Sequence, residues 1–472
     1  MLMGTLVAQA TPLLASPFLA RMYGPEAFGI QTLFMGVASA LAVLATCRLD
    51  LAMVLPEADT EAGELAAVVL AMTAVLCLLL LAAAAVAGPA LAAASGHADQ
   101  QAWLWMLPLM VGATACTQVC VAFASRRHSF PRVAAANVTN QLVYVASSIG
   151  VGLAGAWLQG LALAKLLGQS AGTLMLGASA ATRPRLLRLP DREAAQALLA
   201  RYRQFLVFNT PYSLVGSVAR DAPIFLFSAA GASAPAGYYG LARTMLMAPT
   251  LLASNAFSQV FYREAVSLKG TPRLQELTLT LLRAGLTVGA PLFAFGAVWG
   301  DLLFATIFGT GWHMAGVMAM WLAPAAWMSV QTGWPERLFE VHMRQGVSFA
   351  VQMGSDLATA GLAGLTWLLT RDAVLAIAAF AVCNVLYHHG YLAALFHVAG
   401  FSAARLAGAL ATGWGMFALS AGALAGLRLA AGAGLAAMGL SLACALTFAI
   451  ACGLRARRAA RRPAPLTSGA PN

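Results

Sequence analysis

The sequence contains few charged residues. Only 10% of its 472 residues are Asp, Glu, Lys or Arg, whereas about 25% is usual in soluble globular domains. Hydrophobic residues make up 60% of the chain and fall in runs of about 20, the length at which a helix crosses a ~30 Å hydrocarbon core. The composition therefore excludes a soluble enzyme, a soluble DNA-binding protein and a secreted disulfide-linked domain. It predicts an all-α polytopic membrane protein.

Motifs of enzyme chemistry are also lacking. The seven cysteines form no C-x-x-C pair, and all of them lie in or beside apolar runs. We expect them to be small apolar packing residues rather than metal ligands. No P-loop, metal-ligand cluster or nucleophile motif occurs in the sequence. We therefore predict that the chain is not an enzyme and that it needs no cofactor or metal.

What the sequence does contain is a series of apolar segments. Counting the apolar runs between polar breaks gives about fourteen candidate membrane-spanning helices. They cover residues 2–20, 27–55, 64–88, 102–124, 133–153, 158–178, 204–228, 236–261, 274–298, 312–333, 346–369, 373–397, 403–427 and 431–454. The longest polar stretch, 181–203, separates six spans from eight, and we predict that it is a basic, partly amphipathic helix on the cytoplasmic membrane surface. Residues 455–472 are predicted to form a basic, disordered cytoplasmic tail.

Basic residues are distributed asymmetrically between the loops. If the N-terminus is cytoplasmic, the cytoplasmic loops and tail hold 21 of the 28 Lys and Arg residues, and the outer loops hold only Arg21, Arg371 and Arg428. Because basic residues collect on the cytoplasmic side of membrane proteins, this count predicts that both termini are cytoplasmic. It also favours an even number of spans.

Two predicted outer hairpins share a sequence pattern. Residues 23–30 (YGPEAFGI) follow the first span and residues 234–241 (APAGYYGL) follow the seventh. Each has a proline and then an aromatic–glycine pair just before the next span opens, where proline fixes the first helical turn and glycine permits close helix approach. Two such hairpins indicate two related six-helix lobes, as internal repeats do in many transporters.

The opening of the chain resembles a known family in three pieces. These are the R-x-Y-x-P-E-x-F-G turn over 21–29, the R-L-x-x-A-x-x-L-P helix end over 48–56, and the acidic stretch Glu57–Glu64. Together they are similar to the start of Wzx-type polysaccharide flippases, which act in O-antigen, capsule or exopolysaccharide synthesis. These flippases belong to the multidrug/oligosaccharidyl-lipid/polysaccharide exporter superfamily.

The resemblance implies a fold and a function. The fold would be two six-helix lobes around a central cavity plus two accessory helices, with the N-terminal lobe over 1–180, the C-terminal lobe over 204–400 and the accessory spans over 401–454. The substrate would be undecaprenyl-pyrophosphate-linked oligosaccharide, flipped across the bacterial inner membrane for surface polysaccharide or lipopolysaccharide biosynthesis. Expected partners are this substrate, membrane lipids, a polysaccharide polymerase and a chain-length regulator, with no nucleic acid.

Basic residues inside predicted spans give candidate binding residues, since a charge at mid-bilayer costs about 2.5–3.5 kcal/mol. At 1.5 Å per residue, Arg220 and Arg243 lie roughly 10–12 Å below the outer surface, and Lys165 lies at a similar depth. Such a cationic cavity suits a pyrophosphate, to which Arg presents a bidentate fork. We predict Lys165, Arg220 and Arg243 as substrate-binding residues, and Arg48 as a second, cytoplasmic contact. Arg283 is expected to reach the inner surface instead.

Three acidic residues are candidates for ion pairing or for coupling to a proton or sodium gradient. Asp221 is adjacent to Arg220 and either bridges Arg220 and Arg243 or forms a structural ion pair. Asp356 lies in the middle of the predicted span 346–369. Asp50 and Arg48 have two interpretations. They either form a buried pair within an extended second helix or simply lie at the cytoplasmic end of that helix.

Three other functions remain as alternatives. A membrane glycosyltransferase or polymerase would need acidic catalytic residues in a large outer loop, but the longest predicted outer loop, 299–312, has Asp301 as its only acid. A cation-coupled multidrug exporter of the same superfamily would resemble this chain in fold, yet residues 1–25 lack the carboxylate on which that branch relies. A lipid II flippase would share both the fold and a cationic cavity, but the opening motifs resemble the polysaccharide branch more.

Overall fold

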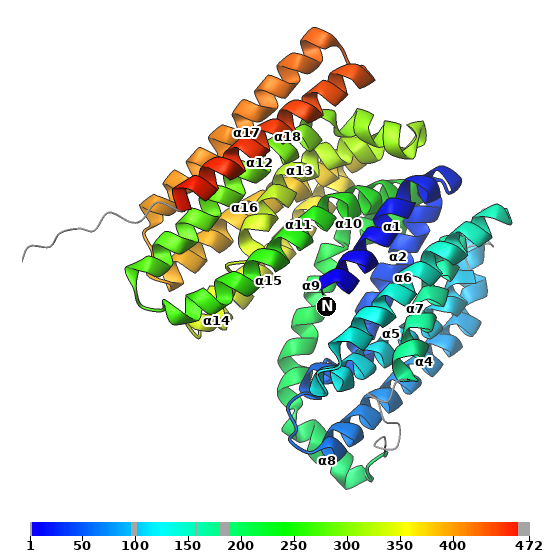
Figure 1. Cartoon of the computed structure of the whole chain (residues 1–472). Coiled ribbons are helices and arrows are strands. Elements are labelled where there is room, and N and C mark those ends of the chain that lie inside the picture. Colours follow the sequence, from blue (N-terminus) through cyan, green and yellow to red (C-terminus); the bar gives the residue numbers. More distant parts are fainter. Residues whose placement is uncertain (1, 96–101, 156–157, 179–187, 461–472) are drawn as a thin grey trace, which may run out of the picture. The chain divides into compact units, whose positions relative to one another are not determined.

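The long apolar runs fold into helices throughout the part of the chain that the structure describes. The computed structural model describes residues 2–95, 102–155, 158–178 and 188–460, and every regular element within these ranges is helical (Figure 1). Residues 181–187 of the predicted linker and 461–472 of the predicted tail lie outside the described residues.

The described residues up to Arg201 form eight helices. They are α1 (Leu2–Met22), α2 (Pro25–Thr46), α3 (Leu49–Ala52), α4 (Asp59–Ser95), α5 (Ala102–Arg126), α6 (Phe130–Leu153), α7 (Gly160–Gly177) and α8 (Arg192–Arg201). The remaining elements are the π-helical turn η3 (Phe205–Asn209), α9 (Thr210–Arg220), α10 (Ala222–Ala229), α11 (Ser233–Ser267), α12 (Pro272–Phe308), the 3₁₀ turn η4 (Thr310–Trp312), α13 (His313–Gly333), α14 (Arg337–Val341), α15 (Gln345–Thr370), α16 (Ala373–Val398), α17 (Ala403–Ala431) and α18 (Leu435–Ala460).

Each of the fourteen predicted spans coincides with a helix or a helical series, but several of the predicted spans differ from the observed helices. The second span ends at Thr46 rather than at residue 55, because Cys47 and Arg48 adopt left-handed conformations with φ of 44° and 55°. The seventh span is broken into η3, α9 and α10. The helix α12 continues to Phe308, so most of the predicted outer loop 299–312 is helical. The helix α18 likewise continues to Ala460, into the predicted tail.

Seven of the described helices are long and apolar enough to cross a membrane on length and composition alone. They are α2, α4, α5, α12, α16, α17 and α18. Several of the other predicted spans carry the in-span charges: α7 contains Lys165, α11 contains Arg243, and α15 contains Asp356. A helix that places a charge inside the membrane must offset its cost, so these helices are where function is expected.

Contacts divide the chain into two units. The first comprises Met1–Leu241, Ile307–Trp312 and Ala363–Ala376, and the second comprises Ala242–Thr306, His313–Leu362 and Ile377–Asn472. The predicted lobe boundaries at 180, 204 and 400 stay a prediction. Each unit is described by itself below.

Close packing in the first unit depends on glycine. A Cβ on Gly168 of α7 would lie 2.6 Å from the Asn140 carbonyl oxygen, and one on Gly172 would lie 2.9 Å from the Ala136 carbonyl oxygen. The two glycines therefore allow α7 to lie directly against the backbone of α6. This contact fixes which α6 side chains face α7.

A polar network joins α5, α6 and α7. Asn140 donates to the Gln169 side-chain oxygen at 2.8 Å, and the Gln169 amide donates to the Thr117 hydroxyl at 2.8 Å. The hydroxyls of Thr117 and Thr173 are 2.6 Å apart. Such pairing satisfies polar side chains where lipid offers no partner.

The acidic stretch of the opening motif is held by basic residues of α5 and α8. Arg126 donates to the carbonyl oxygens of Met53 and Pro56 at 3.1 and 2.6 Å and to the Asp59 carboxylate at 3.0 Å. Glu61 accepts from Arg201 at 2.8 Å and from the Tyr202 hydroxyl at 2.9 Å. The acidic motif therefore anchors the loop before α4 and the helix α8.

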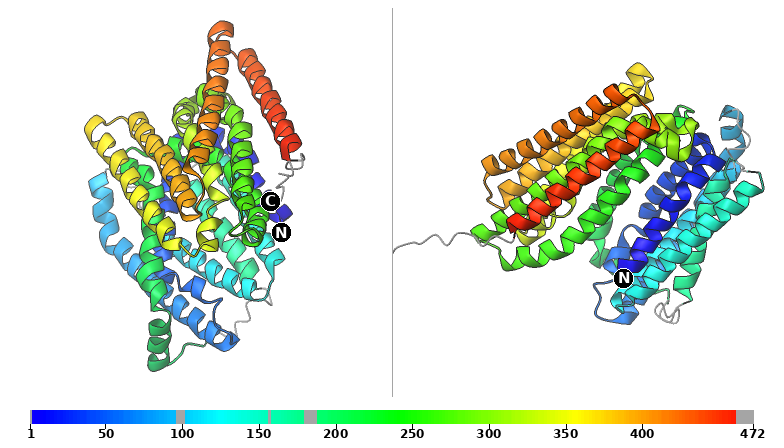
Figure 2. Two further views of the ribbon diagram at one scale, coloured as in Figure 1. Left: turned by 90° about the vertical axis from the view of Figure 1, so that its left-hand side faces the viewer. Right: turned by 45° about the horizontal axis from the view of Figure 1, so that its top comes forward.

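The second unit is built around large aromatic side chains. Trp299, Trp327 and Trp334 are almost completely buried there. Arg428 of α17 donates to both oxygens of Asp301 at 2.9 and 2.7 Å, and its guanidinium lies 5.0 Å from the Trp299 ring centre. Asp301 therefore joins two helices instead of standing in a loop. The neighbouring α17 and α18, orange and red in Figure 2, lie side by side in the same unit.

Candidate functional site

Lys165 is the most distinctive of the predicted binding residues. Its ammonium nitrogen lies 3.6 Å from the centre of the Tyr144 ring, within the distance of a cation–π interaction. Gln31 of α2 donates to the Tyr144 hydroxyl at 3.0 Å, and this amide is buried. Three helices thus hold the aromatic ring on which the ammonium rests.

The position of Tyr144 follows from the α6–α7 contact. Gly168 lies one turn after Lys165, and a Cβ on Gly168 would come within 2.9 Å of the Tyr144 Cβ. Because α7 approaches α6 this closely, the Lys165 side chain reaches across the tyrosine ring. The Tyr144 carbonyl also accepts from Ser148 at 2.7 Å, one turn along α6.

No carboxylate within the described residues lies at ion-pair distance from Lys165. The ion pairs found there involve other basic residues, and the contact described for the Lys165 ammonium is the Tyr144 ring. An ammonium has three N–H donors and no acceptor. A half-buried ammonium without a counterion is suited to receive an anionic group.

Tyr144 and Gln31 were not among the residues predicted from the sequence. A signal for Tyr144 is present, since the polar residues of α6 recur at helical spacing. They are Asn137, Asn140, Gln141, Tyr144, Ser147 and Ser148. Gln31 has no such signal, because its only polar neighbour in this part of α2 is Thr32 and no polar residues recur there at helical spacing.

Arg220 and Asp221 lie at the break between α9 and α10. Arg220 is exposed, and its carbonyl oxygen accepts from the Tyr239 hydroxyl at 3.4 Å. Asp221 is half-buried, and its carboxylate lies 3.6 Å from the position of a Cβ on Gly36 of α2. The small residue on α2 therefore leaves room for the carboxylate beside it.

Arg48 and Asp50 are brought together at the end of α2. Their side chains approach to 4.0 Å, and Arg48 also donates to the Ser213 hydroxyl of α9 at 2.8 Å. Asp50 is 7% exposed, and one of its carboxylate oxygens has no hydrogen-bond partner within the described part of the chain. The break after Thr46 places the two residues just beyond the end of α2, with Asp50 buried and Arg48 partly exposed, and their cytoplasmic location stays a prediction.

The environment of Asp50 has an electrostatic consequence. Burial raises the pKa of its carboxyl above the ordinary value of 3.8, while the Arg48 charge and a hydrogen bond from Thr46 oppose this rise. Asp50 belongs to the short α3, between the spanning helices α2 and α4. Desolvation therefore outweighs the partly exposed guanidinium at this position.

The other two predicted residues belong to the second unit. Arg243 is half-buried on α11. Asp356 of α15 accepts from the Gln352 amide at 2.9 Å, and the Gln352 side-chain oxygen accepts from the Tyr387 hydroxyl of α16. Asp356 thus belongs to a hydrogen-bonded chain with Gln352 and Tyr387. The grouping of Lys165, Arg220 and Arg243 in one cavity stays a prediction.

Comparison with known proteins identifies the family. The model of the family described as "Polysaccharide biosynthesis protein" matches residues 18–316. Because the match covers more than half of the chain, the chain belongs to this family. No curated protein sequence matches significantly.

Solved structures show the same fold at low sequence identity. The structure of "Lipid II flippase MurJ, inward closed conformation" has a TM-score of 0.73 and 11% identity, with 98% of this chain and 99% of that chain covered. An inward-facing multidrug resistance MATE family transporter of the MOP superfamily has a TM-score of 0.59 and 16% identity, with 83% and 95% covered. The predicted all-α fold of about fourteen spanning helices is therefore confirmed.

Proposed function

We propose that this member of the polysaccharide biosynthesis protein family flips undecaprenyl-pyrophosphate-linked oligosaccharide from the cytoplasmic to the outer leaflet of the bacterial inner membrane. The observation that carries the proposal is Lys165 of α7, a predicted spanning helix. Its ammonium rests on the Tyr144 ring, and no carboxylate of the described residues lies at ion-pair distance from it. Family membership supports a role in polysaccharide synthesis. Two lobes would move the substrate by alternating access.

The head group explains why basic residues are needed. A pyrophosphate must exchange its hydration for fixed donors as it enters the protein, and ammonium and guanidinium groups supply charge-assisted hydrogen bonds. Lys165, Arg220 and Arg243 would hold the pyrophosphate, and Arg48 would contact it at the cytoplasmic side. The prenyl chain would remain in the bilayer, and no covalent step or cofactor is required.

Coupling to an ion gradient would use the chain of groups at Asp356. Its carboxylate accepts from Gln352, which in turn accepts from Tyr387. Protonation of Asp356, or binding of sodium by its oxygens, would remove a negative charge from α15. Such a change of charge inside the membrane can bias one conformation over another.

The cellular setting follows from the same proposal. Both termini would be cytoplasmic, and the protein would act in lipopolysaccharide or O-antigen synthesis. Its product would pass to a polysaccharide polymerase and a chain-length regulator. Nucleic acid has no part in this scheme.

Complementation tests the function. A strain that lacks its own O-antigen flippase would express the wild type, Lys165→Ala, Arg220→Ala or Arg243→Ala at matched protein levels, and surface polymer would be measured. We expect the wild type to restore polymer and each variant to lose most of it. Arg132→Ala is the matched control, because Arg132 is an exposed arginine at the start of α6.

The outcomes separate the function from its site. Restoration that survives all three substitutions would retain the flippase and reject these residues. The second candidate is lipid II translocation, which is favoured by the fold shared with the lipid II flippase. Rescue of a strain depleted of its lipid II flippase, without restoration of surface polymer, would select that candidate. Drug resistance without either rescue would favour the multidrug exporter.

A further inference from the structure

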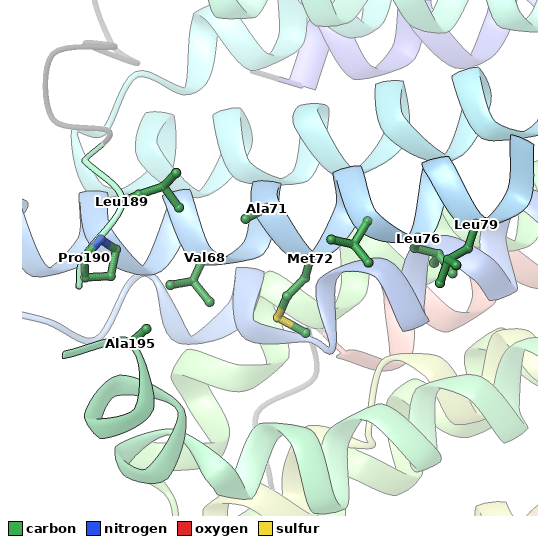
Figure 3. Close-up of a pocket in the computed structure, with 9 residues that line it drawn as sticks. Val68, Ala71, Met72, Leu76, Leu79, Leu189, Pro190 and Ala195 are labelled. Atoms are coloured by element: carbon green, nitrogen blue, oxygen red, sulfur yellow. The ribbon is translucent and has the colours of Figure 1, made fainter. Parts of the chain in front are cut away.

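An apolar groove of about 480 Å³ runs along one face of α4 (Figure 3). Its walls include Val68, Ala71, Val75 and Leu79 of α4, together with Leu189 of the segment that leads into α8 and Ala195 of α8. All of its lining side chains are apolar. The volume lies in the range of about 300–1,000 Å³ that is typical of ligand pockets.

The groove opens on the outer face of a spanning helix. Its α4 residues recur every three or four positions, so they form one stripe about 16 Å long at 1.5 Å per residue. Val75 and Leu79 are 57% and 62% exposed, although α4 is one of the most apolar helices. On a spanning helix, such exposed apolar side chains face lipid.

One end of the groove is closed by a segment that is firmly held. Leu198 of α8 and Tyr202 are buried in a core with Leu65 of α4. The Tyr202 hydroxyl and Arg201 both donate to Glu61. The wall formed by Leu189 and Ala195 is therefore fixed by contacts that lie outside the groove.

Basic side chains stand beside this closed end. Arg188 and Arg192 are exposed and flank the wall residues Leu189 and Pro190. Neither guanidinium takes part in an ion pair with another described residue. The carboxylate of Asp191 between them accepts from the Ala194 backbone N–H at 2.8 Å as the cap of α8. The closed end therefore combines the apolar groove with two available guanidinium groups.

We propose that this groove holds one acyl chain of an anionic phospholipid from the leaflet beside α8, with the phosphate between Arg188 and Arg192. An apolar slot that opens to hydrocarbon suits an acyl chain, and guanidinium groups pair with phosphate through bidentate hydrogen bonds. A bound lipid would join α4 to α8 and to the segment that leads into it. The site would be separate from Lys165 and would not depend on the flipped substrate.

Native mass spectrometry of the purified full chain tests this proposal. The protein would be equilibrated with equal amounts of phosphatidylglycerol and phosphatidylcholine of the same acyl chains, and the retained lipid would be counted. We expect phosphatidylglycerol to be retained preferentially. Ala71→Trp, which fills the groove, should abolish this preference. Arg188→Gln with Arg192→Gln should reduce the preference by about fivefold for each arginine.

Matched controls distinguish the groove from general attraction of lipid. Leu78→Trp adds the same ring to an exposed position of α4 that does not line the groove, and Arg203→Gln removes an exposed arginine beyond α8. Both should retain phosphatidylglycerol as the wild type does. Equal retention in all variants would overturn the proposal. Displacement of phosphatidylglycerol by undecaprenyl phosphate at lower concentration would also overturn it, because the groove would then be a substrate site.

Discussion

Gly29 of α2 and Gly237 of α11 pack backbone against backbone within the first unit. A Cβ on Gly29 would overlap the Ser233 carbonyl oxygen, and a Cβ on Gly237 would overlap the Pro25 carbonyl oxygen. Each glycine belongs to one of the two hairpins that the sequence marks as a repeat. The aromatic–glycine pair of the second hairpin is Tyr239–Gly240, so Gly237 is an additional glycine of that hairpin. It lets the two helices meet without side chains between them.

This contact predicts that Gly29→Ala destabilises the protein. The added methyl group cannot be accommodated without moving the backbone of α11, and overpacking of this kind costs about 1–3 kcal/mol. The thermal unfolding midpoint of the protein in detergent should fall. Gly354→Ala is the control, because a Cβ there meets no atom within 4 Å and the change favours the helix. Equal midpoints for the two variants would contradict the prediction.

Substitutions at Lys165 and Tyr144 should separate the effect of the ammonium charge from the effect of side-chain shape. Lys165→Met should weaken substrate binding by about 10- to 100-fold, since charge-assisted hydrogen bonds contribute roughly 1.5–3 kcal/mol. Lys165→Arg should keep part of the activity. Tyr144→Leu removes the ring beneath the ammonium, whereas Tyr144→Phe retains it, so transport by the phenylalanine variant should be higher. Transport of lipid-linked oligosaccharide in proteoliposomes measures both comparisons, and full activity of Lys165→Met would reject the site.

The contacts of Arg126 predict that this residue stabilises the loop before α4. Its guanidinium donates to two backbone carbonyls and to Asp59, so Arg126→Gln should leave these acceptors without partners and cost about 1–3 kcal/mol. The unfolding midpoint should fall, and proteolysis should become faster between Met53 and Asp59. Arg132→Gln removes an exposed arginine nearby and should change neither measurement. A similar loss in both variants would point to total charge instead.

Asp50 predicts a pH dependence of stability. Because burial raises the pKa of its carboxyl in the folded state, the folded protein binds this proton more tightly than the unfolded chain does. Its stabilising contribution is complete below the ordinary pKa of 3.8 and is lost as the pH rises through the raised value. In Asp50→Asn the uncharged amide does not titrate, so this pH-dependent loss of stability is absent. The thermal unfolding midpoint of the variant minus that of the wild type should therefore increase from pH 4 towards neutral pH. A difference in midpoint that does not change with pH would contradict this prediction.

Asp356 predicts the loss of ion coupling. Asp356→Asn removes the charge that a gradient would act on but retains an acceptor for Gln352, so the helices should remain folded. Transport should become insensitive to an imposed proton or sodium gradient, while exchange without a gradient should continue. Asp372→Asn is the control, since this exposed carboxylate caps the start of α16. Unchanged gradient dependence in Asp356→Asn would exclude it as the coupling residue.

The helices could be predicted from the sequence, because an apolar run of sufficient length has few alternatives to a spanning helix. The residues at which the helices end were less predictable. The apolar residues Leu51–Leu55 suggested a longer second helix, but the left-handed Cys47 and Arg48 end it at Thr46. Hydropathy contains no information on such backbone conformations. The same limit explains why the break at Asp221 was not expected.

Repeated membrane spanning could be predicted from the sequence alone, and the opening motifs indicated the family. These properties depend on composition and on short local patterns. The tertiary structure was needed to show that Lys165 rests on Tyr144, that Gln31 completes this site, and that Asp301 pairs with Arg428. Partners far apart in the chain meet through close helix contacts, and hydropathy does not record which faces of the helices touch.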